Sequence, residues 1–295
     1  MRLLRRTLLA LLILGALALL WGTWMARRSF PIVDGSVRLP GLERDVTVGR
    51  DAAGVPHISA DTLEDLFRAQ GYVHAQDRFW QMDTWRHIGA GRLAEMFGDG
   101  QVETDAFLRT LGFERLAAEA YDAMPSRLRS GLEAYAEGVN AYLEERPGGA
   151  PLSLEYAALG LQNGDYRPEP WEPVHTLTWA HVMAWDLRNN LKEEIERTFV
   201  SGDVGEERVE DLFPPYPPGH PLIVETGSAT ARRGDARPWP GAEEALARAA
   251  GRIERVDSVL GEPFDGIGSN SWVVDGSRTA SGLPLVANDP HLGIQ

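Results

Sequence analysis

The residues best suited to chemistry lie near the C-terminal end of the sequence. Ser269 follows Gly268 and opens the run Ser-Asn-Ser-Trp-Val-Val-Asp, and a segment rich in small and polar residues precedes it. Taken alone, a serine in this position is most often a turn residue. A glycine before it has no Cβ, however, so the serine hydroxyl can approach the glycine carbonyl. The combination indicates a processing site at the Gly268–Ser269 bond.

Cleavage of that bond would supply the Ser269 hydroxyl with a base. A serine hydroxyl is a poor nucleophile at neutral pH unless a base accepts its proton. A free α-amino group has a pKa of about 8 and is therefore partly neutral at working pH. After cleavage the amine and the hydroxyl would belong to one residue, which is the N-terminal form of a nucleophile and its base. The uncut chain has an amide there, so we expect it to be inactive on a substrate.

Other candidate residues are individually weaker. His291 lies in the run Asn-Asp-Pro-His, where a loop histidine hydrogen-bonded to the backbone is the commoner interpretation. Met183 and Leu187 are four residues apart, which is equally typical of a core-facing helix stripe. The remaining histidines, His57, His74, His87, His175 and His181, show no metal-ligand spacing, and we expect them to be structural.

An acidic run offers the ligand type that calcium prefers. Glu193, Glu194 and Glu196 follow an expected helix, and carboxylate oxygens are hard ligands suited to Ca²⁺. A solvated acidic helix face is the commoner explanation of such a run.

Composition excludes several classes of protein. The chain has 295 residues, with 29 Lys and Arg against 43 Asp and Glu, which gives a formal net charge of −14. A chain of that charge repels a phosphate backbone, so we expect no nucleic-acid partner. The absence of cysteine excludes disulfides, thiolate metal sites and a cysteine nucleophile. The single lysine, Lys192, has Asn189 three residues before it, so the Ser-x-x-Lys pattern of transpeptidase-type enzymes is missing.

The N-terminal segment is expected to enter a membrane. Thr7–Ala26 carries no charge, and a helix of that length spans roughly 30 Å, the hydrocarbon thickness of a bilayer. Arg5 and Arg6 place its N-terminal end on the cytoplasmic side. An uncleaved anchor is favoured over a cleaved signal peptide because the stretch is long and its end contains the bulky Trp21 and Trp24.

Local patterns predict a mainly helical middle region. Asp61 and Glu64 form a capping-box pattern that opens a helix from Thr62, and Gly71 is expected to interrupt it. Five charged residues, Arg50, Asp77, Arg78, Asp83 and Arg86, are expected to form buried ion pairs, and the family resemblance described below implies that these lie between subunits. The expected strands are Asp45–Val48, Val55–Ser59, Asn270–Asp275 and Leu283–Ala287. The expected helices are Val73–Ile88, Glu114–Ala123, Ser126–Leu143, Pro173–Leu191 and Gly241–Val259. The expected loops are Arg146–Pro173, Pro214–Pro221 and Thr226–Pro240.

Several motifs together resemble the penicillin acylases, which are N-terminal-nucleophile hydrolases. The resemblance extends from about residue 43 to the end of the sequence. The motifs are RDAAGVPHISA (Arg50–Ala60), DLFRAQGYVHAQDRFWQMDTWRHIGAGRLAEMFG (Asp65–Gly98), the Asp105/Arg109 pair, GLEAYAEGVNAYL (Gly131–Leu143), WEPVHTLTWAHVMAW (Trp171–Trp185) and GSNSWVVDGSRTASGLPLVANDPHLG (Gly268–Gly293). His291 brings the chain nearer to the acyl-homoserine-lactone and cephalosporin acylases, because penicillin G acylases carry Gln at the matching position.

The resemblance implies an α+β precursor that is cleaved between Gly268 and Ser269. It implies four segments: a membrane anchor or signal segment (1–30), a mostly helical α-subunit region (31–225), a spacer (226–268) and the start of a β subunit (269–295). The last segment would supply the first two strands of an αββα sandwich. Because two strands cannot form that sandwich, the 295 residues alone are expected to be inactive.

The resemblance also implies roles for individual residues. Ser269 and His291 would be catalytic, and the oxyanion donors would lie further downstream. Met183, Asp186 and Leu187 would contact the substrate, and Asp186 replaces an Arg of penicillin G acylases. Glu194 would be one ligand of a structural Ca²⁺, with no organic cofactor.

The expected product is an extracytoplasmic αβ heterodimer, anchored or secreted. Its small-molecule substrate would be a linear amide that joins an acyl group to an amine nucleus such as a β-lactam or homoserine lactone. The alternative is a non-catalytic, membrane-tethered binding or assembly protein derived from a truncated acylase.

Overall fold

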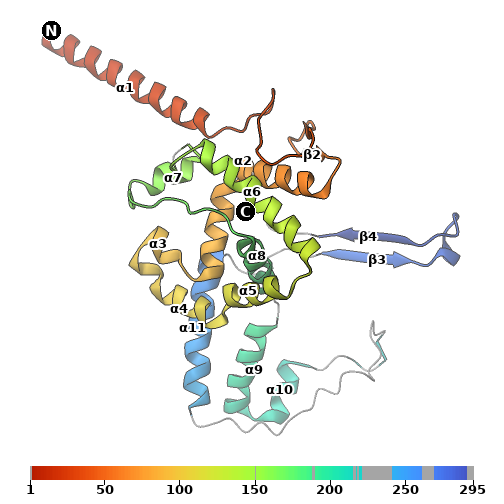
Figure 1. Cartoon of the computed structure of the whole chain (residues 1–295). Coiled ribbons are helices and arrows are strands. Elements are labelled where there is room, and N and C mark those ends of the chain that lie inside the picture. The colour runs from red at the N-terminus through yellow and green to blue at the C-terminus, as the bar shows by residue number, and fades with distance from the viewer. Residues whose placement is uncertain are drawn as a thin grey trace. The chain divides into compact units, whose positions relative to one another are not determined.

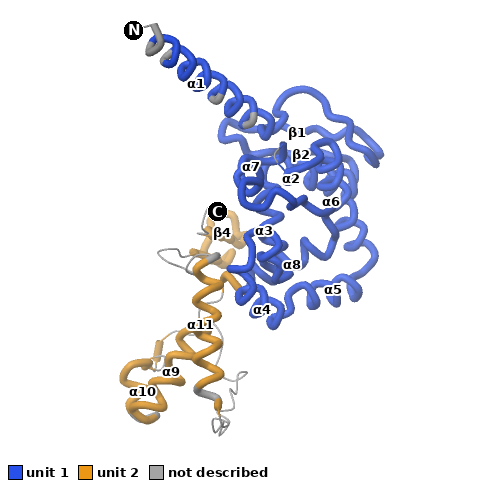
Figure 2. Tube along the Cα trace, turned by 90° about the vertical axis from the view of Figure 1, so that its left-hand side faces the viewer, with its two compact units in different colours: residues 1–184 blue, residues 185–295 orange. Residues whose placement is uncertain are grey.

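The computed structural model describes residues 2–149, 151–187, 190–214, 217, 219–220, 241–260 and 269–290. The chain divides into two compact units, Met1–Ala184 and Trp185–Gln295 (Figure 2). The described residues are mostly helical, with short strands paired as two antiparallel hairpins (Figure 1). This agrees with the predicted fold class, a helical region followed by two strands.

Most of the elements belong to the first unit. Its helices are α1 (Arg2–Arg28), α2 (Leu63–Ala90), α3 (Leu93–Phe97), α4 (Val102–Leu111), α5 (Phe113–Ala123), α6 (Ser126–Glu145), α7 (Leu154–Leu159) and α8 (Pro173–Asp186), which ends just inside the second unit. A 3₁₀ turn, η1 (Asp99–Gln101), joins α3 to α4, and the strands are β1 (Thr47–Arg50) and β2 (Pro56–Ser59). The second unit contains α9 (Leu191–Val204), α10 (Glu206–Leu212), α11 (Ala242–Leu260), β3 (Asn270–Val274), the turn η2 (Gly276–Arg278) and β4 (Leu285–Asp289).

The first helix has the composition of a membrane span. Its stretch Arg5–Arg28 has 24 residues and is apolar and long enough to cross a bilayer, and none of its apolar window is buried in the structure. By length and composition alone, a signal sequence passes the same test.

The first hairpin and the start of α2 follow the predicted local chemistry. β1 pairs with β2 in antiparallel register, from Thr47 opposite Ser59 to Arg50 opposite Pro56. The α2 cap differs by one residue from the prediction, because Thr62 and not Asp61 is the N-cap and accepts a hydrogen bond from the Asp65 amide at 3.1 Å. Asp65 is then free to accept the backbone amides of the incoming segment.

The predicted interruption of α2 at Gly71 is wrong. The helix continues to Ala90, and its one non-helical residue is Arg78, at φ −143°. Gly71 instead lies where α6 crosses α2, and a Cβ built on Gly71 would be 2.1 Å from the Tyr135 carbonyl oxygen. Across the same crossing, a Cβ on Gly138 would be 1.9 Å from the Arg68 carbonyl oxygen. The two glycines therefore allow backbone-to-backbone approach of the two longest helices of the globular part.

The main core forms where α2 and α6 meet the segment 152–171. Its largest fully buried side chains include Tyr142 and Phe79, and Tyr72 meets Tyr142 edge to face with ring centroids 5.5 Å apart. The predicted loop Arg146–Pro173 is not wholly irregular, because α7 forms within it. Tyr156 and Leu159 of α7 are both buried in this core, so tertiary packing stabilises a helix too short to be stable alone.

The predicted boundaries of the later elements need adjustment. The predicted helix Pro173–Leu191 is wrong at its C-terminal end, because α8 ends at Asp186 and α9 begins at Leu191. The polar helix before Ser269 forms as α11. α3 and α4 were not expected. Gly91 is the C-cap of α2, as expected of a glycine at the end of that helix, and Gly112 is the C-cap of α4. Thr226–Pro240 and half of Pro214–Pro221 lie outside the described residues.

The second hairpin also has a longer turn than predicted. β4 begins at Leu285, two residues later than expected. The Asp275 carboxylate accepts the Ser277 amide at 2.9 Å, and the Thr279 hydroxyl donates to the Leu283 carbonyl at 2.8 Å. The turn therefore extends to Leu283, whose carbonyl is occupied by the Thr279 hydroxyl, and strand pairing begins after that residue.

Candidate functional site

The second hairpin positions Ser269 directly before a paired strand. β3 and β4 are antiparallel, and the ladder runs from Val274 opposite Leu285 to Asn270 opposite Asp289. Ser269 is exposed and immediately precedes Asn270. The register therefore returns the chain, at Asp289 and Pro290, to the end of the hairpin at which Ser269 lies. Gly268 and His291 lie outside the described residues, so their predicted roles stay predictions.

Both faces of this hairpin carry exposed apolar side chains. Trp272 and Leu285 on one face are 55% and 51% exposed, and Val273 and Val286 on the other face are 68% and 73% exposed. Strands with a solvated face alternate apolar and polar residues, whereas strands covered on both faces are apolar throughout. The hairpin therefore has the composition of strands that are covered on both sides.

The α8 helix, which carries Met183, is held at its start by two other helices. The Asn140 side chain of α6 makes two hydrogen bonds with the Trp171 backbone, donating to the carbonyl at 2.9 Å and accepting the amide at 2.7 Å. Arg86 of α2 donates to the carbonyls of Glu169 and Pro170, both at 3.0 Å. The chain entering α8 is thus fixed by side chains from α2 and α6. Asn140 was not singled out from the sequence, because an asparagine inside a helix has no local pattern that indicates its distant partner.

Close packing continues along α8. Gly89 lies within α2, where a Cβ would be 2.2 Å from the Thr178 methyl group, and Thr178 is buried. Val182, one turn further along α8, is fully buried, whereas the adjacent Met183 is half-buried. Asp186 is half-buried and Leu187 is 41% exposed. The predicted substrate residues therefore occupy the partly accessible end of α8, and the buried stripe of the helix is formed by Thr178 and Val182 instead.

Asp83 is the centre of a buried polar cluster that includes Arg86, which also binds the chain entering α8. The Asp83 carboxylate is fully buried and accepts hydrogen bonds from Arg86 Nε at 2.7 Å, Tyr156 at 2.5 Å and Tyr166 at 2.7 Å. Burial and the nearby Asp83 charge raise the pKa of both tyrosines, so they stay protonated and donate. His87 Nδ1 donates to the Asp83 carbonyl, 2.7 Å away. Every member therefore has a partner, which is the condition for a buried charge to be tolerated.

Four of the five residues predicted to form ion pairs do so, within one region of the chain, whereas Arg78 forms none among the described residues. Arg50 of β1 makes a two-pronged ion pair with Asp77 of α2, with both N–O distances 2.8 Å. Asp83 pairs with Arg86 on the same helix at 2.6 Å. The expectation of an inter-subunit role is corrected because both partners of each pair belong to the helical unit. Arg50 links the first hairpin to α2, which no local pattern predicts.

The Asp105/Arg109 pair of the sequence motifs organises a turn. The Asp105 carboxylate accepts the backbone amides of Leu93 and Ala94, each at 2.8 Å, and so caps the start of α3. Arg109 Nε donates to the Gly91 carbonyl at 2.8 Å. Gly91 has φ +63°, and a Cβ there would be 2.7 Å from the Asp105 carbonyl oxygen. Both charged residues thus hold the α2–α3 turn.

The described histidines agree with structural roles. His175 Nδ1 accepts the Glu172 amide at 2.9 Å near the start of α8, and burial lowers the pKa of His175 to about 4. His181 stacks on Phe113 with an interplanar angle of 4°. Among the described residues no group of three or more His, Cys, Asp or Glu could hold a metal ion.

Glu194 lies in the first turn of α9 and is exposed, as is Glu193 beside it. An exposed carboxylate can provide one calcium ligand. The described residues place no further ligand set around it.

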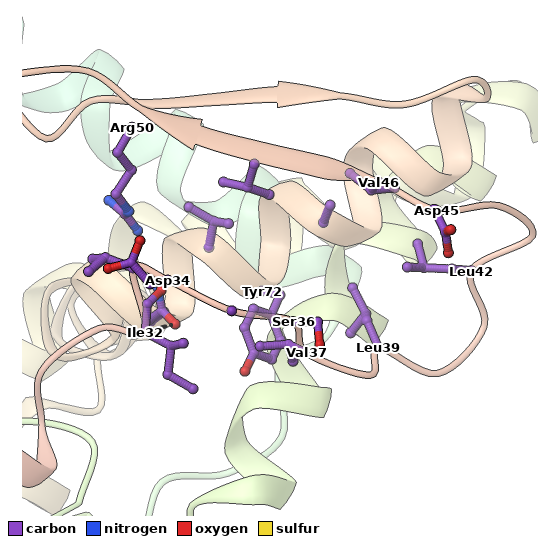
Figure 3. A pocket seen from close by; sticks show the side chains of 16 residues that line it. Ile32, Asp34, Ser36, Val37, Leu39, Leu42, Asp45, Val46, Arg50 and Tyr72 are labelled. Atoms are coloured by element: carbon purple, nitrogen blue, oxygen red, sulfur yellow. Dashed lines mark hydrogen bonds between the residues drawn. The ribbon is translucent and has the colours of Figure 1, made fainter.

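A cavity of about 440 Å³ lies between the segment 32–50 and α2 (Figure 3). Its lining is mixed, with apolar Val37, Leu39 and Val46 beside polar Asp34 and Asp45. Two of its polar side chains already have partners in the body, since Arg50 pairs with Asp77 and Gln76 pairs with the Ile32 backbone. No predicted site residue lines it, so the cavity is separate from the proposed chemistry.

Comparisons with known proteins identify the relatives of this chain. A family model described as penicillin amidase matches residues 45–295. The chain is 36% identical over 274 residues to the penicillin acylase 2 proenzyme of Pseudomonas sp. (strain SE83), covering 89% of this chain and 32% of that protein. It is 35% identical over 274 residues to the acyl-homoserine lactone acylase QuiP of Pseudomonas aeruginosa, covering 92% and 31%.

A solved structure, the thermostable penicillin G acylase from Alcaligenes faecalis, aligns with 61% of this chain and 97% of that chain at 30% identity and a TM-score of 0.47. The chain spans about a third of the length of the curated relatives it matches.

Proposed function

Because the chain belongs to the penicillin amidase family, we propose that it is the N-terminal part of an acylase precursor that is cleaved between Gly268 and Ser269. The mature enzyme would hydrolyse a linear amide between an acyl group and an amine nucleus such as a β-lactam or a homoserine lactone. The names of the relatives support this reaction class, since they include a penicillin acylase and an acyl-homoserine lactone acylase.

The observation that carries the proposal is the position of Ser269. It is exposed and directly precedes a strand whose pairing fixes the next residue, Asn270, opposite Asp289. Once the bond before Ser269 is cut, its amine and hydroxyl would stand together at the start of a paired strand. A nucleophile held by regular structure needs little reorganisation before it attacks.

The proposed reaction uses the new amine as base. The amine accepts the Ser269 Oγ proton, directly or through a water, while Oγ attacks the acyl carbon of the substrate amide. The tetrahedral intermediate collapses, the C–N bond breaks, and the same proton leaves on the amine product. Water then hydrolyses the Ser269 ester, so that the acyl group leaves as a carboxylic acid. In this scheme His291 orients Ser269.

The proposed acyl site uses the accessible end of α8. Met183 and Leu187 would supply apolar contacts, and Asp186 would place a negative charge where penicillin G acylases carry a positive one. A carboxylate on the acyl side would therefore be disfavoured.

We also propose that Glu194 contributes one carboxylate to a structural Ca²⁺ site. Its exposed position allows this, and the other ligands would come from outside the described residues. Ca²⁺ would act by holding segments together, and no chemical step uses it.

The stretch Arg5–Arg28 would anchor the protein, with the remainder of the chain outside the cytoplasm. Arg5 and Arg6 favour a cytoplasmic N-terminal end. The name "proenzyme" of one relative supports processing, so the partner of the helical region would be its own β subunit in an αβ heterodimer.

The test compares two serine variants of the full-length protein. Ser269→Ala should leave a single chain with no amidase activity, because neither processing nor acyl transfer has a nucleophile. Ser271→Ala, at an exposed serine two residues later on the same strand, should process normally. N-terminal sequencing of the second wild-type chain should begin Ser-Asn-Ser-Trp. Normal two-chain processing of the Ser269→Ala variant would refute the mechanism, and an uncut, inactive wild-type protein would support the non-catalytic binding role.

A further inference from the structure

Three apolar side chains follow the end of α1 and are exposed. Phe30 and Val33 are each 61% exposed, and Ile32 is 45% exposed. We call Phe30, Ile32 and Val33 the post-anchor patch. The three residues occupy four consecutive positions, interrupted only by an exposed proline. A concentration of exposed apolar residues of this kind marks an interaction surface more often than a scattered apolar side chain does.

Hydrogen bonds hold this segment against the globular body. Arg146, directly after α6, donates to the Arg28 carbonyl at 2.7 Å. The Gln76 side chain of α2, which is 6% exposed, accepts the Ile32 amide at 3.1 Å and donates to the Ile32 carbonyl at 3.3 Å. The end of α1 is therefore joined to α2 and α6 by fixed contacts and not by an extended linker.

The aromatic residues of α1 indicate where the membrane surface would lie. Trp21 and Trp24 are exposed near the C-terminal end of the apolar stretch, and the Arg28 guanidinium lies 4.6 Å from the centre of the Trp24 ring. Tryptophan is enriched at the level of the lipid headgroups. α1 continues for four residues past Trp24, about 6 Å, and Phe30 lies two residues beyond its end. The patch therefore falls within the interfacial layer of the same bilayer face.

We propose that the post-anchor patch inserts into the interfacial layer of the lipid bilayer and docks the helical body directly on the membrane. This inference rests on the proposed anchor. The partner is the lipid surface itself, since Phe30 lies only two residues beyond the last residue of α1, Arg28, and the segment that carries the patch is hydrogen-bonded to the body.

The contact is apolar in character. Exposed charges of both signs flank the patch, since Arg27 and Arg28 precede it at the end of α1. The exposed acidic side chains nearby are Asp34, Glu144 and Glu145. The opposite signs offset one another, so anionic headgroups gain no general attraction there. Insertion should therefore occur in zwitterionic vesicles and persist at high salt. Electrostatic membrane binding would behave in the opposite way.

Residues 1–295 contain no cysteine, so a single introduced cysteine is the one thiol among them that a fluorophore can label. Single variants Phe30→Cys and Val33→Cys of the full-length protein are labelled with an environment-sensitive fluorophore and reconstituted into phosphatidylcholine vesicles that contain shallow, spin-labelled lipids. Leu14→Cys, inside α1, reports insertion of the anchor. Leu128→Cys is the matched control, because Leu128 is 57% exposed but lies about 27 Å from Arg146 along α6.

Several-fold stronger quenching at Phe30→Cys and Val33→Cys than at Leu128→Cys, unchanged by high salt, is the expected result. Quenching at Leu14→Cys alone would overturn the docking proposal and leave the anchor intact. No quenching at any position would overturn both. Quenching at the patch that scales with protein density, and vanishes on dilution in lipid, would assign the patch to a second copy of the chain instead.

Discussion

The crossing of α2 and α6 allows one stability prediction to be worked out in detail. Substituting Gly138→Ala adds a Cβ 1.9 Å from the Arg68 carbonyl oxygen, 2.8 Å from the Arg68 carbonyl carbon and 3.0 Å from the Tyr72 amide nitrogen. All three atoms belong to the α2 backbone, so no side-chain rotation can relieve the contact. The two helices must separate by about 1.5 Å to restore an ordinary carbon–oxygen contact.

The expected cost is set by two opposing effects. Overpacking a core typically costs about 1 to 3 kcal/mol, and a backbone contact belongs at the upper end of that range. Alanine gains about 1 kcal/mol over glycine in a helix interior. The net loss should be about 2 kcal/mol, concentrated at this crossing because Val139 and Tyr142 beside it are fully buried.

Hydrogen–deuterium exchange of the full-length protein measures this loss locally. The Val139 and Tyr142 amides should exchange roughly 30-fold faster in the Gly138→Ala protein, since about 1.4 kcal/mol corresponds to a factor of ten. The Gly131→Ala variant on the same helix is the control, because its Cβ would meet only the Phe67 ring, at 3.1 Å, which can rotate away. Unchanged protection in Gly138→Ala would refute the close-crossing explanation.

Three further perturbations test the structure around α8 and α3. Asp83→Asn should destabilise the protein by about 3 kcal/mol or more, because Arg86 would remain buried without its counter-charge. The unfolding midpoint measures this loss, and recovery of much of the lost stability in the double variant Asp83→Asn, Arg86→Met would confirm the cause. Asp105→Ala should cost about 1 to 2 kcal/mol, since it removes the carboxylate that caps α3, and an unchanged midpoint would contradict that role. The pKa of His175 falls from 6.5 to about 4 on folding, so the unfolded state binds more protons than the folded state between these two pH values. The free energy of unfolding should therefore fall as the pH drops through this window, by at most about 2 kcal/mol near pH 5. Unfolding midpoints of the wild type and His175→Gln should converge across this window, and parallel pH profiles would contradict the assignment.

Local patterns in the sequence predicted much of the secondary structure correctly. The first hairpin, the helices Phe113–Ala123 and Ser126–Glu145 and the polar helix before Ser269 all form close to their expected positions. Each depends on period, capping or turn residues within one element, which act over a few residues. Element ends were less accurate, as at β4, where hydrogen bonds of the turn delay the pairing.

The interruption predicted at Gly71 failed for a physical reason. A glycine inside a helical pattern weakens the helix locally, and the sequence does not show that a second helix approaches the same atom. In the folded protein the Tyr135 carbonyl oxygen of α6 lies so close to Gly71 that a Cβ there is excluded. Glycine here is required by packing and not by a turn.

The sequence by itself determined the chemistry to be tested: a serine after a glycine ahead of a strand, an apolar segment long enough to span a bilayer, and the motifs of one family. Only the tertiary structure decided which distant groups meet. It joined Asn140 to Trp171 at the start of α8, Arg50 to Asp77, and the two ends of the hairpin beside Ser269. Residue types and spacing act along the chain, whereas these contacts depend on how separate elements pack, and packing is set by all of the side chains together.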